Sequence, residues 1–288
     1  MEGIRGVLYV VATPIGNLGD ITDRARKVLT DVDLIAAEDT RQTRHLLTHC
    51  GIGTRLIAYH DHNESAAAAG LIASLESGLN IALVSDAGTP LISDPGYDLV
   101  CAARDRGLTV IPIPGANAAI CALCAAGLPS DRFLFLGFPP RVGAQRRTWI
   151  AAVAREPGTL VLYESGRRAA ETLADVAAVL GETRRAVVAR ELTKRFETFL
   201  VGTARELAGR LETEDEQRLG ELVILVEGCR EPVEGDRAEH ERVLRVLAAE
   251  LPMRQAAGLA ARLTGGRKND LYALGVELGL GTGRPDER

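Results

Sequence analysis

Short apolar runs alternate with segments of helical periodicity in the first part of the chain. The apolar runs predict strands at residues 6–12, 33–37, 79–84 and 109–113, and the periodic segments predict helices at 21–30, 65–75 and 97–106. Strands that alternate with helices build βαβ units around a mostly parallel sheet. We therefore expect an α/β domain at residues 1–118.

A second series of strands and helices begins after the Gly- and Pro-containing segment 137–141. A helix is predicted at 168–180, and strands are predicted at 159–163, 186–190, 196–201 and 222–227. The connections are shorter here and some neighbouring strands resemble hairpins. A second α/β domain with a mixed sheet is therefore expected at residues 119–230.

The last part of the chain has a different composition. Residues 230–240 are charged and contain Pro232 and Gly235, which predicts a linker. A small helical domain is predicted at 241–278, with an apolar stripe formed by Leu244, Val246, Leu247 and Leu251. The expected fold class is thus α/β, with two α/β domains and a small C-terminal helical segment.

Composition is that of an ordinary globular enzyme: 288 residues, 46% hydrophobic and 25% charged. The formal net charge of −5 argues against a broadly basic nucleic-acid-binding surface but leaves room for a local basic patch. The five cysteines are odd in number and lie in apolar contexts, which fits a reducing compartment. No apolar run is long enough to span a bilayer, so we expect a cytoplasmic protein without a membrane partner.

Cys121 and Cys124 have a C-x-x-C spacing inside an alanine-rich run. No second pair and no histidine lies nearby in the sequence, so a metal or redox site is not expected there.

Polar or Gly/Pro-rich loops follow four of the predicted strands, after Ala12, Ala37, Val84 and Ile113. The carboxyl ends of parallel strands lie at one edge of a sheet, where open α/β sheets bind ligands. The most informative of these loops is residues 85–96, SDAGTPLISDPG, whose glycines, prolines and aspartates set turn conformations. A well-specified turn without a ligand is the alternative interpretation.

The loop at residues 13–20, TPIGNLGD, is neither G-x-G-x-x-G nor a Walker loop, which disfavours kinase or NTPase chemistry. The strand-end loops offer carboxylates and hydroxyls but no cluster of cations. Because a polyphosphate would meet like charge there, the loops favour a neutral or positively charged ligand.

A family resemblance rests on eight motifs in order: TPIGNLGD, AEDTRQTRHLL, SDAGTPLISDPG, PGANAAICALCAAGLPSDRF, GFPPR, YES, ARELTKRFET and GELVILVEG. They resemble the tetrapyrrole-methylase superfamily, specifically its bacterial branch of 16S ribosomal RNA 2′-O-ribose methyltransferases, which modify a cytidine of the decoding centre. The match covers residues 6–228, and residues 254–278 resemble the branch's small helical domain. The resemblance implies a kidney-shaped pair of α/β domains with a cofactor cleft between them. It further implies S-adenosylmethionine as methyl donor, 16S rRNA within the 30S subunit as substrate, and a homodimer.

The same resemblance implies which residues hold the cofactor. Pro14 should border it, and the turn Asp86, Ala87, Gly88, Thr89 and Pro90 should hold its ribose and amino-acid part. Further contacts are expected from Leu91, Ile92, Asn117, Ala118, Tyr163 and Leu192.

RNA binding needs cations, because phosphate neutralisation dominates nucleic-acid affinity. The favoured group is Arg141, Arg146 and Arg147, which follows a Gly/Pro loop. Other candidates are Arg184, Arg185, Lys194, Arg195, Arg254, Arg262, Arg267 and Lys268. An exposed, solvated charge is the alternative explanation for each of them.

The reaction implied is in-line attack of a ribose 2′-hydroxyl on a sulfonium methyl, with most of the rate supplied by positioning. Glu191 and Lys194 are the candidate catalytic residues, and Glu38 and Asp39 are further candidates for a base. All four are equally open to interpretation as structural ion pairs.

The chain departs from the branch at two points. Gly166-Arg167 stands where relatives usually have Pro or Thr and then His, and Pro139 stands where they tend to have Leu. Two alternative functions stay open: a tetrapyrrole C-methyltransferase of the same fold, and a non-catalytic cofactor-sensing or ribosome-binding module.

Overall fold

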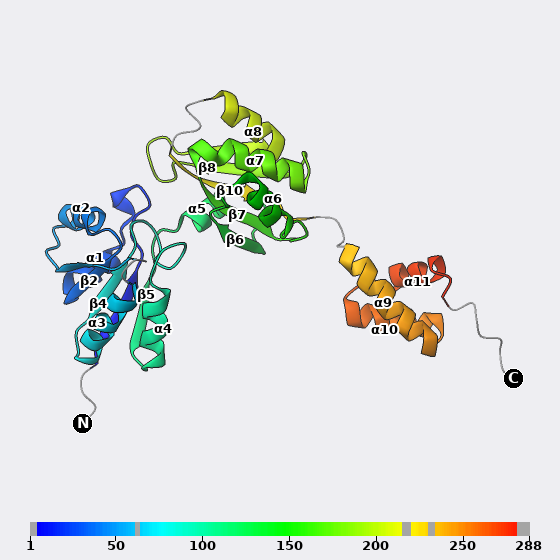
Figure 1. Cartoon of the computed structure of the whole chain (residues 1–288), viewed down its shortest axis with the longest axis horizontal. Helices are drawn as coiled ribbons and strands as arrows, with labels where there is room; N and C mark the ends of the chain where they lie inside the picture. Colours follow the sequence, from blue (N-terminus) through cyan, green and yellow to red (C-terminus); the bar gives the residue numbers. More distant parts are fainter. Residues whose placement is uncertain (1–4, 61–63, 215–219, 230–233, 281–288) are drawn as a thin grey trace. The chain divides into compact units, whose positions relative to one another are not determined.

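The computed structural model describes residues 5–60, 64–214, 220–229 and 234–280. The chain divides into two compact units, Met1–Gly228 and Cys229–Arg288. The first unit contains two five-stranded sheets, and the second contains only helices in its described part (Figure 1). In the described ranges, no helix combines the length and apolarity that crossing a membrane requires.

The first sheet has the strand order β3-β2-β4-β1-β5, and all of its strand pairs are parallel. Its elements are β1 (Val7–Val11), η1 (Leu18–Asp20), α1 (Asp23–Asp31), β2 (Leu34–Ala37), α2 (Thr40–Cys50), β3 (Leu56–Ala58), α3 (Glu64–Glu76), β4 (Ile81–Val84), α4 (Tyr97–Asp105) and β5 (Thr109–Ile113). The predicted parallel α/β architecture is confirmed, although α2 and the short β3 were not predicted.

Helices cover both faces of this sheet, which explains why its strands are apolar throughout. Every residue of β2 and β4 is buried. Along β4, Ile81 and Leu83 pack with α3 and α4, whereas Ala82 and Val84 pack with α1 and α2. In α2, which was not predicted, the buried residues are Thr43, Leu46 and Leu47.

The second sheet has the order β6-β7-β10-β8-β9 and is mixed, as predicted: β6 and β7 pair in parallel and the other pairs are antiparallel. Its elements are α5 (Ala118–Ala125), β6 (Phe133–Gly137), α6 (Gly143–Ala151), β7 (Thr159–Ser165), α7 (Gly166–Leu180), β8 (Arg185–Arg190), β9 (Thr198–Thr203), α8 (Ala204–Thr213) and β10 (Glu221–Val226).

One face of the second sheet packs against α6, α7 and α8 through side chains such as Ile150, Leu173 and Leu207 (Figure 1). The opposite face packs against α5 through Ala122 and Leu123. The predicted domain limit at residue 118 stays a prediction; the structure places α5, which begins there, on the second sheet.

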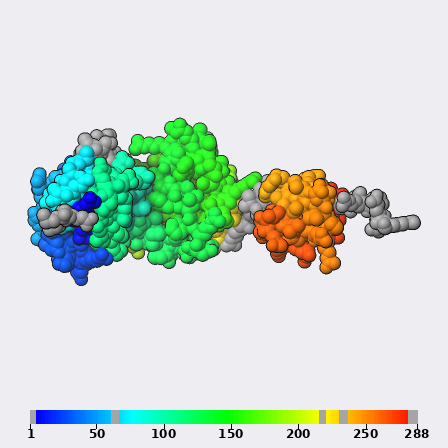
Figure 2. All heavy atoms as spheres, turned by 90° about the horizontal axis from the view of Figure 1, so that it is seen from below, coloured from blue at the N-terminus to red at the C-terminus, as the bar shows by residue number. Residues whose placement is uncertain are grey.

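The C-terminal unit consists of α9 (Glu234–Glu250), α10 (Met253–Thr264) and α11 (Lys268–Glu277). Figure 2 shows these helices, in orange and red, as one closely packed body. Their core includes Leu244, Ala257, Ala260 and Leu271.

Two details of the predicted helical segment are wrong. Residues 234–240, predicted as linker, form the first turns of α9, because charged residues support an exposed helix when they pair one turn apart, as Arg245 does with Glu241. Val246, predicted in the apolar stripe, is 62% exposed, and Val243 is buried instead. Residues 230–233 of the predicted linker lie outside the described residues.

Gly96 ends the SDAGTPLISDPG loop and precedes α4, with a φ of 129°. A Cβ at this position would lie 2.7 Å from Leu83 Cδ2. Gly96→Ala should therefore lower the free energy of unfolding by about 1–3 kcal/mol, measured by urea denaturation. Gly53→Ala is the matched control, because Gly53 has open space and no left-handed backbone. Equal stability of the two variants would contradict the expectation.

Candidate active site

A cavity of about 230 Å³ lies at the carboxyl edge of the first sheet. Its wall includes the loop after β4, the start of α5, and parts of β7, β10 and the loop after β8. The predicted convergence of the four strand-end loops is confirmed, because each lines the cavity: Ile15 after β1, Glu38 after β2, Asp86 after β4 and Asn117 after β5. The second sheet completes the wall.

The loop after β4 is fixed by backbone pairing with the loop after β1. Thr13 N donates to Gly88 O at 2.8 Å, and Gly88 N donates to Thr13 O at 3.1 Å. Thr89 Oγ1 also donates to Ala116 O at 3.0 Å, which joins the loop after β5 to the same structure. Gly88 has a φ of 79°, so glycine is the residue that fits this turn without strain.

Backbone strain is concentrated in two loops. In the described chain, the non-glycine residues with positive φ are Leu91 (71°), Ser93 (70°), Glu191 (50°) and Thr193 (66°). Such conformations cost energy and persist where the surroundings enforce them, commonly at functional sites. Here they lie in the loops after β4 and β8, both of which border the cavity.

The two candidate catalytic residues lie together on the cavity wall. Lys194 Nζ lies 3.0 Å from Glu191 Oε1 and 3.8 Å from Glu221 Oε2. The hydrocarbon part of Lys194 covers Gly16, where a Cβ would lie 2.6 Å from Lys194 Cγ. The loop after β8 is thereby packed on the first loop of the chain, and the catalytic roles stay predictions.

Most of the predicted cofactor residues line this cavity: Asp86, Ala87, Gly88, Thr89, Ile92, Asn117, Ala118, Tyr163 and Leu192. Three do not. Pro14 lines an adjacent cavity, Pro90 is buried, and Leu91 packs against the core on the α3 and α4 side. Pro90 and Leu91 shape the turn and lie outside the wall of this cavity, and their contact with the cofactor stays a prediction.

Tyr163 and Asn117 hold the start of α5 against the cavity. The Tyr163 hydroxyl accepts from Ala119 N at 3.2 Å, and Asn117 Oδ1 caps the helix by accepting from Ile120 N at 3.1 Å. The ring of Tyr163 makes edge contacts with Phe135 and Phe138. Burial raises the pKa of Tyr163 above its ordinary value, so the phenol stays protonated at neutral pH.

Hydrogen bonds join the loops after β2 and β4 beside the cavity. Asp86 Oδ1 accepts from Asp39 N at 2.8 Å, and Asp86 N donates to Glu38 Oε2 at 3.4 Å. The Arg41 guanidinium, hydrogen-bonded to Asp39, lowers the pKa of Asp39 to about 2. So acidic a carboxyl is a weak proton acceptor at neutral pH, which argues against Asp39 as the base.

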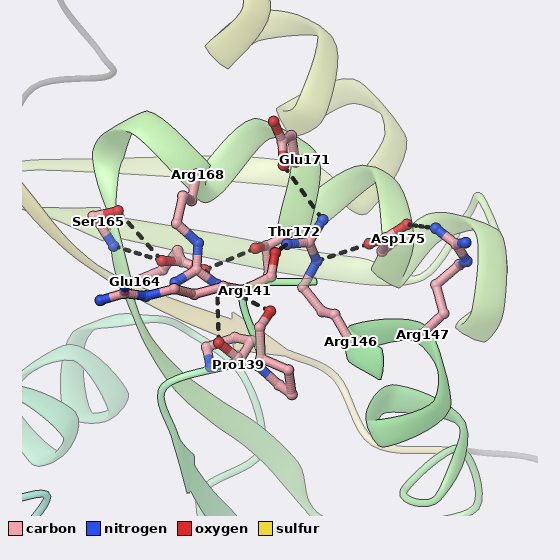
Figure 3. Close-up of polar contacts among 11 residues, drawn as sticks. Pro139, Arg141, Arg146, Arg147, Glu164, Ser165, Arg168, Glu171, Thr172 and Asp175 are labelled. Atoms are coloured by element: carbon pink, nitrogen blue, oxygen red, sulfur yellow. Dashed lines mark hydrogen bonds and ion pairs between the residues drawn. The ribbon is translucent and has the colours of Figure 1, made fainter. Parts of the chain in front are cut away.

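Glu164 is a site residue whose burial the sequence did not predict. It is 1% exposed, lines the cavity, and accepts from Ser165 N and Thr172 Oγ1, each at 2.8 Å. Arg168 Nη2 lies 3.2 Å from Glu164 Oε2 and donates to Pro139 O at 2.9 Å. Figure 3 shows this network, which ties the YES motif to the GFPPR loop.

The same region contains the predicted RNA-binding arginines (Figure 3). Arg146 is 3% exposed, and its Nε lies 2.7 Å from Asp175 Oδ2. Its guanidinium also reaches Glu171, so Arg146 is a structural ion-pair residue, which argues against its predicted contact with RNA. Arg147 pairs with Asp175 but is half-exposed, and Arg141 is exposed.

The other candidate cations fall into three groups. Arg184 donates to Leu180 O and Gly228 O, which makes it a structural residue. Lys194 lies on the cavity wall. The exposed ones are Arg185, Arg195, Arg254, Arg262, Arg267 and Lys268. Gly166 and Arg167 stand where the related branch usually has Pro or Thr and then His. Gly166 is buried at the start of α7, and Arg167 is exposed.

The neighbouring residues Arg146 and Arg147 provide a matched pair of variants. Arg146→Ala should lower the free energy of unfolding by about 3 kcal/mol, because it leaves the Asp175 carboxylate, which is 13% exposed, without its main partner. Arg147→Ala should cost less than about 1 kcal/mol, because that guanidinium is half in solvent. Chemical denaturation of both variants tests this, and the reverse order would contradict the assignment.

The sequence of this chain is similar to those of known proteins. The model of the family "Tetrapyrrole (Corrin/Porphyrin) Methylases" matches residues 7–208, and a model described as "RsmI C-terminal HTH domain" matches residues 234–279. A protein of Escherichia coli O157:H7 named ribosomal RNA small subunit methyltransferase I is 53% identical over 276 residues, 96% of each chain. One of the same name from Pseudomonas aeruginosa is 53% identical over 270 residues, 93% of this chain and 95% of the relative.

Solved structures share the fold of the first unit. A cobalt precorrin-4 methyltransferase matches with a TM-score of 0.57 and 15% identity, covering 77% of this chain and 94% of its own. A diphthine synthase matches with a TM-score of 0.58 and 12% identity, covering 77% and 89%. With two sheets, a shared cavity at their edge and this sequence similarity, the chain belongs to the tetrapyrrole (corrin/porphyrin) methylase family and is a methyltransferase.

Proposed function

We propose that this protein transfers a methyl group from S-adenosylmethionine to the 2′-hydroxyl of a cytidine in the decoding region of 16S ribosomal RNA. The observation that carries the proposal is the 53% identity over 96% of both chains to a ribosomal RNA small subunit methyltransferase I. We further propose a cytoplasmic homodimer that acts on the 30S subunit.

The charge of the cavity wall supports this methyl donor. Among the described residues of the wall, Lys194 is the only cation, and it is outnumbered by carboxylates at Glu38, Asp86, Asp94, Glu164, Glu191 and Glu221. A ligand that carries a sulfonium and an ammonium and no phosphate suits such a wall, since opposite charges attract strongly where water is partly excluded. Gly88 brings backbone to the cavity wall. A Cβ at this position would contact Ile15 and Ala116 O.

In this reaction, different residues of the protein orient the donor, exclude water and accept the proton. S-adenosylmethionine supplies an electrophilic methyl group with a neutral leaving group. The loop after β4 and the start of α5 orient it, and Tyr163, Leu192 and Phe138 exclude water from the cavity. Glu191, paired with Lys194, is the candidate to accept the hydroxyl proton, and the pairing holds its carboxylate at the wall.

The direct test incubates the purified protein with labelled S-adenosylmethionine and unmodified 30S subunits, with protein-free 16S RNA in parallel. The expected result is one methyl group per particle, mapped by mass spectrometry to the ribose 2′-oxygen of a cytidine. Transfer to a porphyrinogen with none to either RNA substrate would establish the alternative, a tetrapyrrole methyltransferase. Binding of the donor and of 30S subunits without any transfer would indicate a non-catalytic module.

Asp86→Asn tests the donor site. The amide keeps an oxygen that accepts from Asp39 N but loses the negative charge, so the Kd for S-adenosylmethionine should rise about 10- to 100-fold in calorimetry. Asp98→Asn is the control, since Asp98 is exposed in the first turn of α4 and lies outside the cavity wall. An unchanged Kd in a folded Asp86→Asn protein would refute the assignment.

A further inference from the structure

A second cavity, of about 390 Å³, adjoins the first. The two share a wall formed by Ile15, Asp86, Ala87, Lys194 and Glu221. The rest of the second cavity is lined by the first loop of the chain and by α2, at Thr13, Pro14, Gly16, Leu18, Gln42, Thr43, His45, Leu46 and Ser85. Its size falls within the range of small-ligand sites, which span about 300–1,000 Å³.

Helix α2 contributes hydrogen-bonding and planar groups to this cavity. Gln42 offers an amide that both donates and accepts, and His45 offers an exposed ring. These residues belong to the TRQTRHLL part of the sequence, which contributes no residue to the wall of the first cavity. Within the full motif, AEDTRQTRHLL, Glu38 lines the first cavity, whereas Gln42, Thr43, His45 and Leu46 line only the second.

Thr43 shows an unused hydrogen-bonding group at the same wall. The residue is 4% exposed, and within the described structure its buried hydroxyl has no hydrogen-bond partner. Thr48, five residues further along α2, behaves as helical threonines commonly do, and its hydroxyl donates to Arg44 O at 2.8 Å. A buried hydroxyl without a partner is destabilising, so its presence at a cavity wall indicates a bound polar group.

We propose that the second cavity is the acceptor subsite and holds one nucleoside taken out of the stacked RNA strand. This inference rests on the proposed function. The ribose faces the shared wall, because methyl transfer requires the 2′-oxygen beside the donor, and Lys194 and Asp86 border both cavities. The base lies toward Gln42, Thr43 and His45, whose amide, hydroxyl and ring match a hydrogen-bonding edge and a planar face.

The experiment compares Thr43→Val and Gln42→Ala with the control Thr48→Val in the 30S methylation assay. Each of the first two should raise the KM for the RNA substrate about 3- to 10-fold, while the Kd for S-adenosylmethionine changes less than about twofold. Thr48→Val should leave both constants unchanged. Thr43→Val should also melt at the same or a higher temperature than the parent protein, because valine keeps the shape and removes the unpaired hydroxyl.

The combination of a raised KM with undiminished thermal stability distinguishes a binding role from a structural one. Unchanged KM values for both Thr43→Val and Gln42→Ala, with an active parent protein, would overturn the acceptor subsite and leave the proposed function intact. A parallel rise in the Kd for S-adenosylmethionine would assign the second cavity to the donor and also overturn the inference. Absence of transfer to RNA by the parent protein would refute the proposed function and, with it, the subsite.

Discussion

The pair of backbone hydrogen bonds between Thr13 and Gly88 is the constraint on which the site depends. It joins the loops after β1 and β4, which are neighbouring parallel strands whose carboxyl ends lie at one edge of the sheet. Both cavities are built on this junction, because Gly88 borders the first and Thr13 borders the second. A change that separated the two loops would therefore alter both cavities at once.

Acidic and basic side chains have different roles in this molecule. The cavity wall is acidic, with Lys194 held between Glu191 and Glu221. Several basic residues of the second domain are committed to structure: Arg146 to Asp175, Arg168 to Glu164, and Arg184 to backbone carbonyls. The cations available to an RNA backbone are consequently the exposed ones, such as Arg141, Arg185 and Arg195.

The sequence predicted the strands that are buried on both sides and several amphipathic helices, such as α1 and α4, but it missed others. Strands such as β2 and β4 form continuous apolar runs because helices cover both faces of their sheet. Two of the helices that were not predicted are α2 and α6. Each buries only a few residues, and no helical periodicity of apolar residues was recognised in their polar sequences. Family motifs located most of the cavity wall, but motif position alone did not show that Leu91 turns into the core.

Burial of charge was equally invisible in the sequence. Arg146 and Arg147 are adjacent and both pair with Asp175 on α7, yet one is 3% exposed and the other half in solvent, because successive helical residues point in directions about 100° apart. The hydroxyl of Thr43 is a similar case, since its lack of a partner depends on packing between α2 and two loops. Such features follow from tertiary contacts that no local pattern encodes.

The left-handed residues in the loops after β4 and β8 connect stability with catalysis. Leu91, Ser93, Glu191 and Thr193 are strained, and the strain is offset by contacts that hold both loops, including the Thr13–Gly88 pair and the packing of Lys194 on Gly16. Methyl transfer from a good leaving group gains most from positioning and little from strong acid–base chemistry. A strained frame suits that demand, because it fixes the walls of both cavities before a ligand binds.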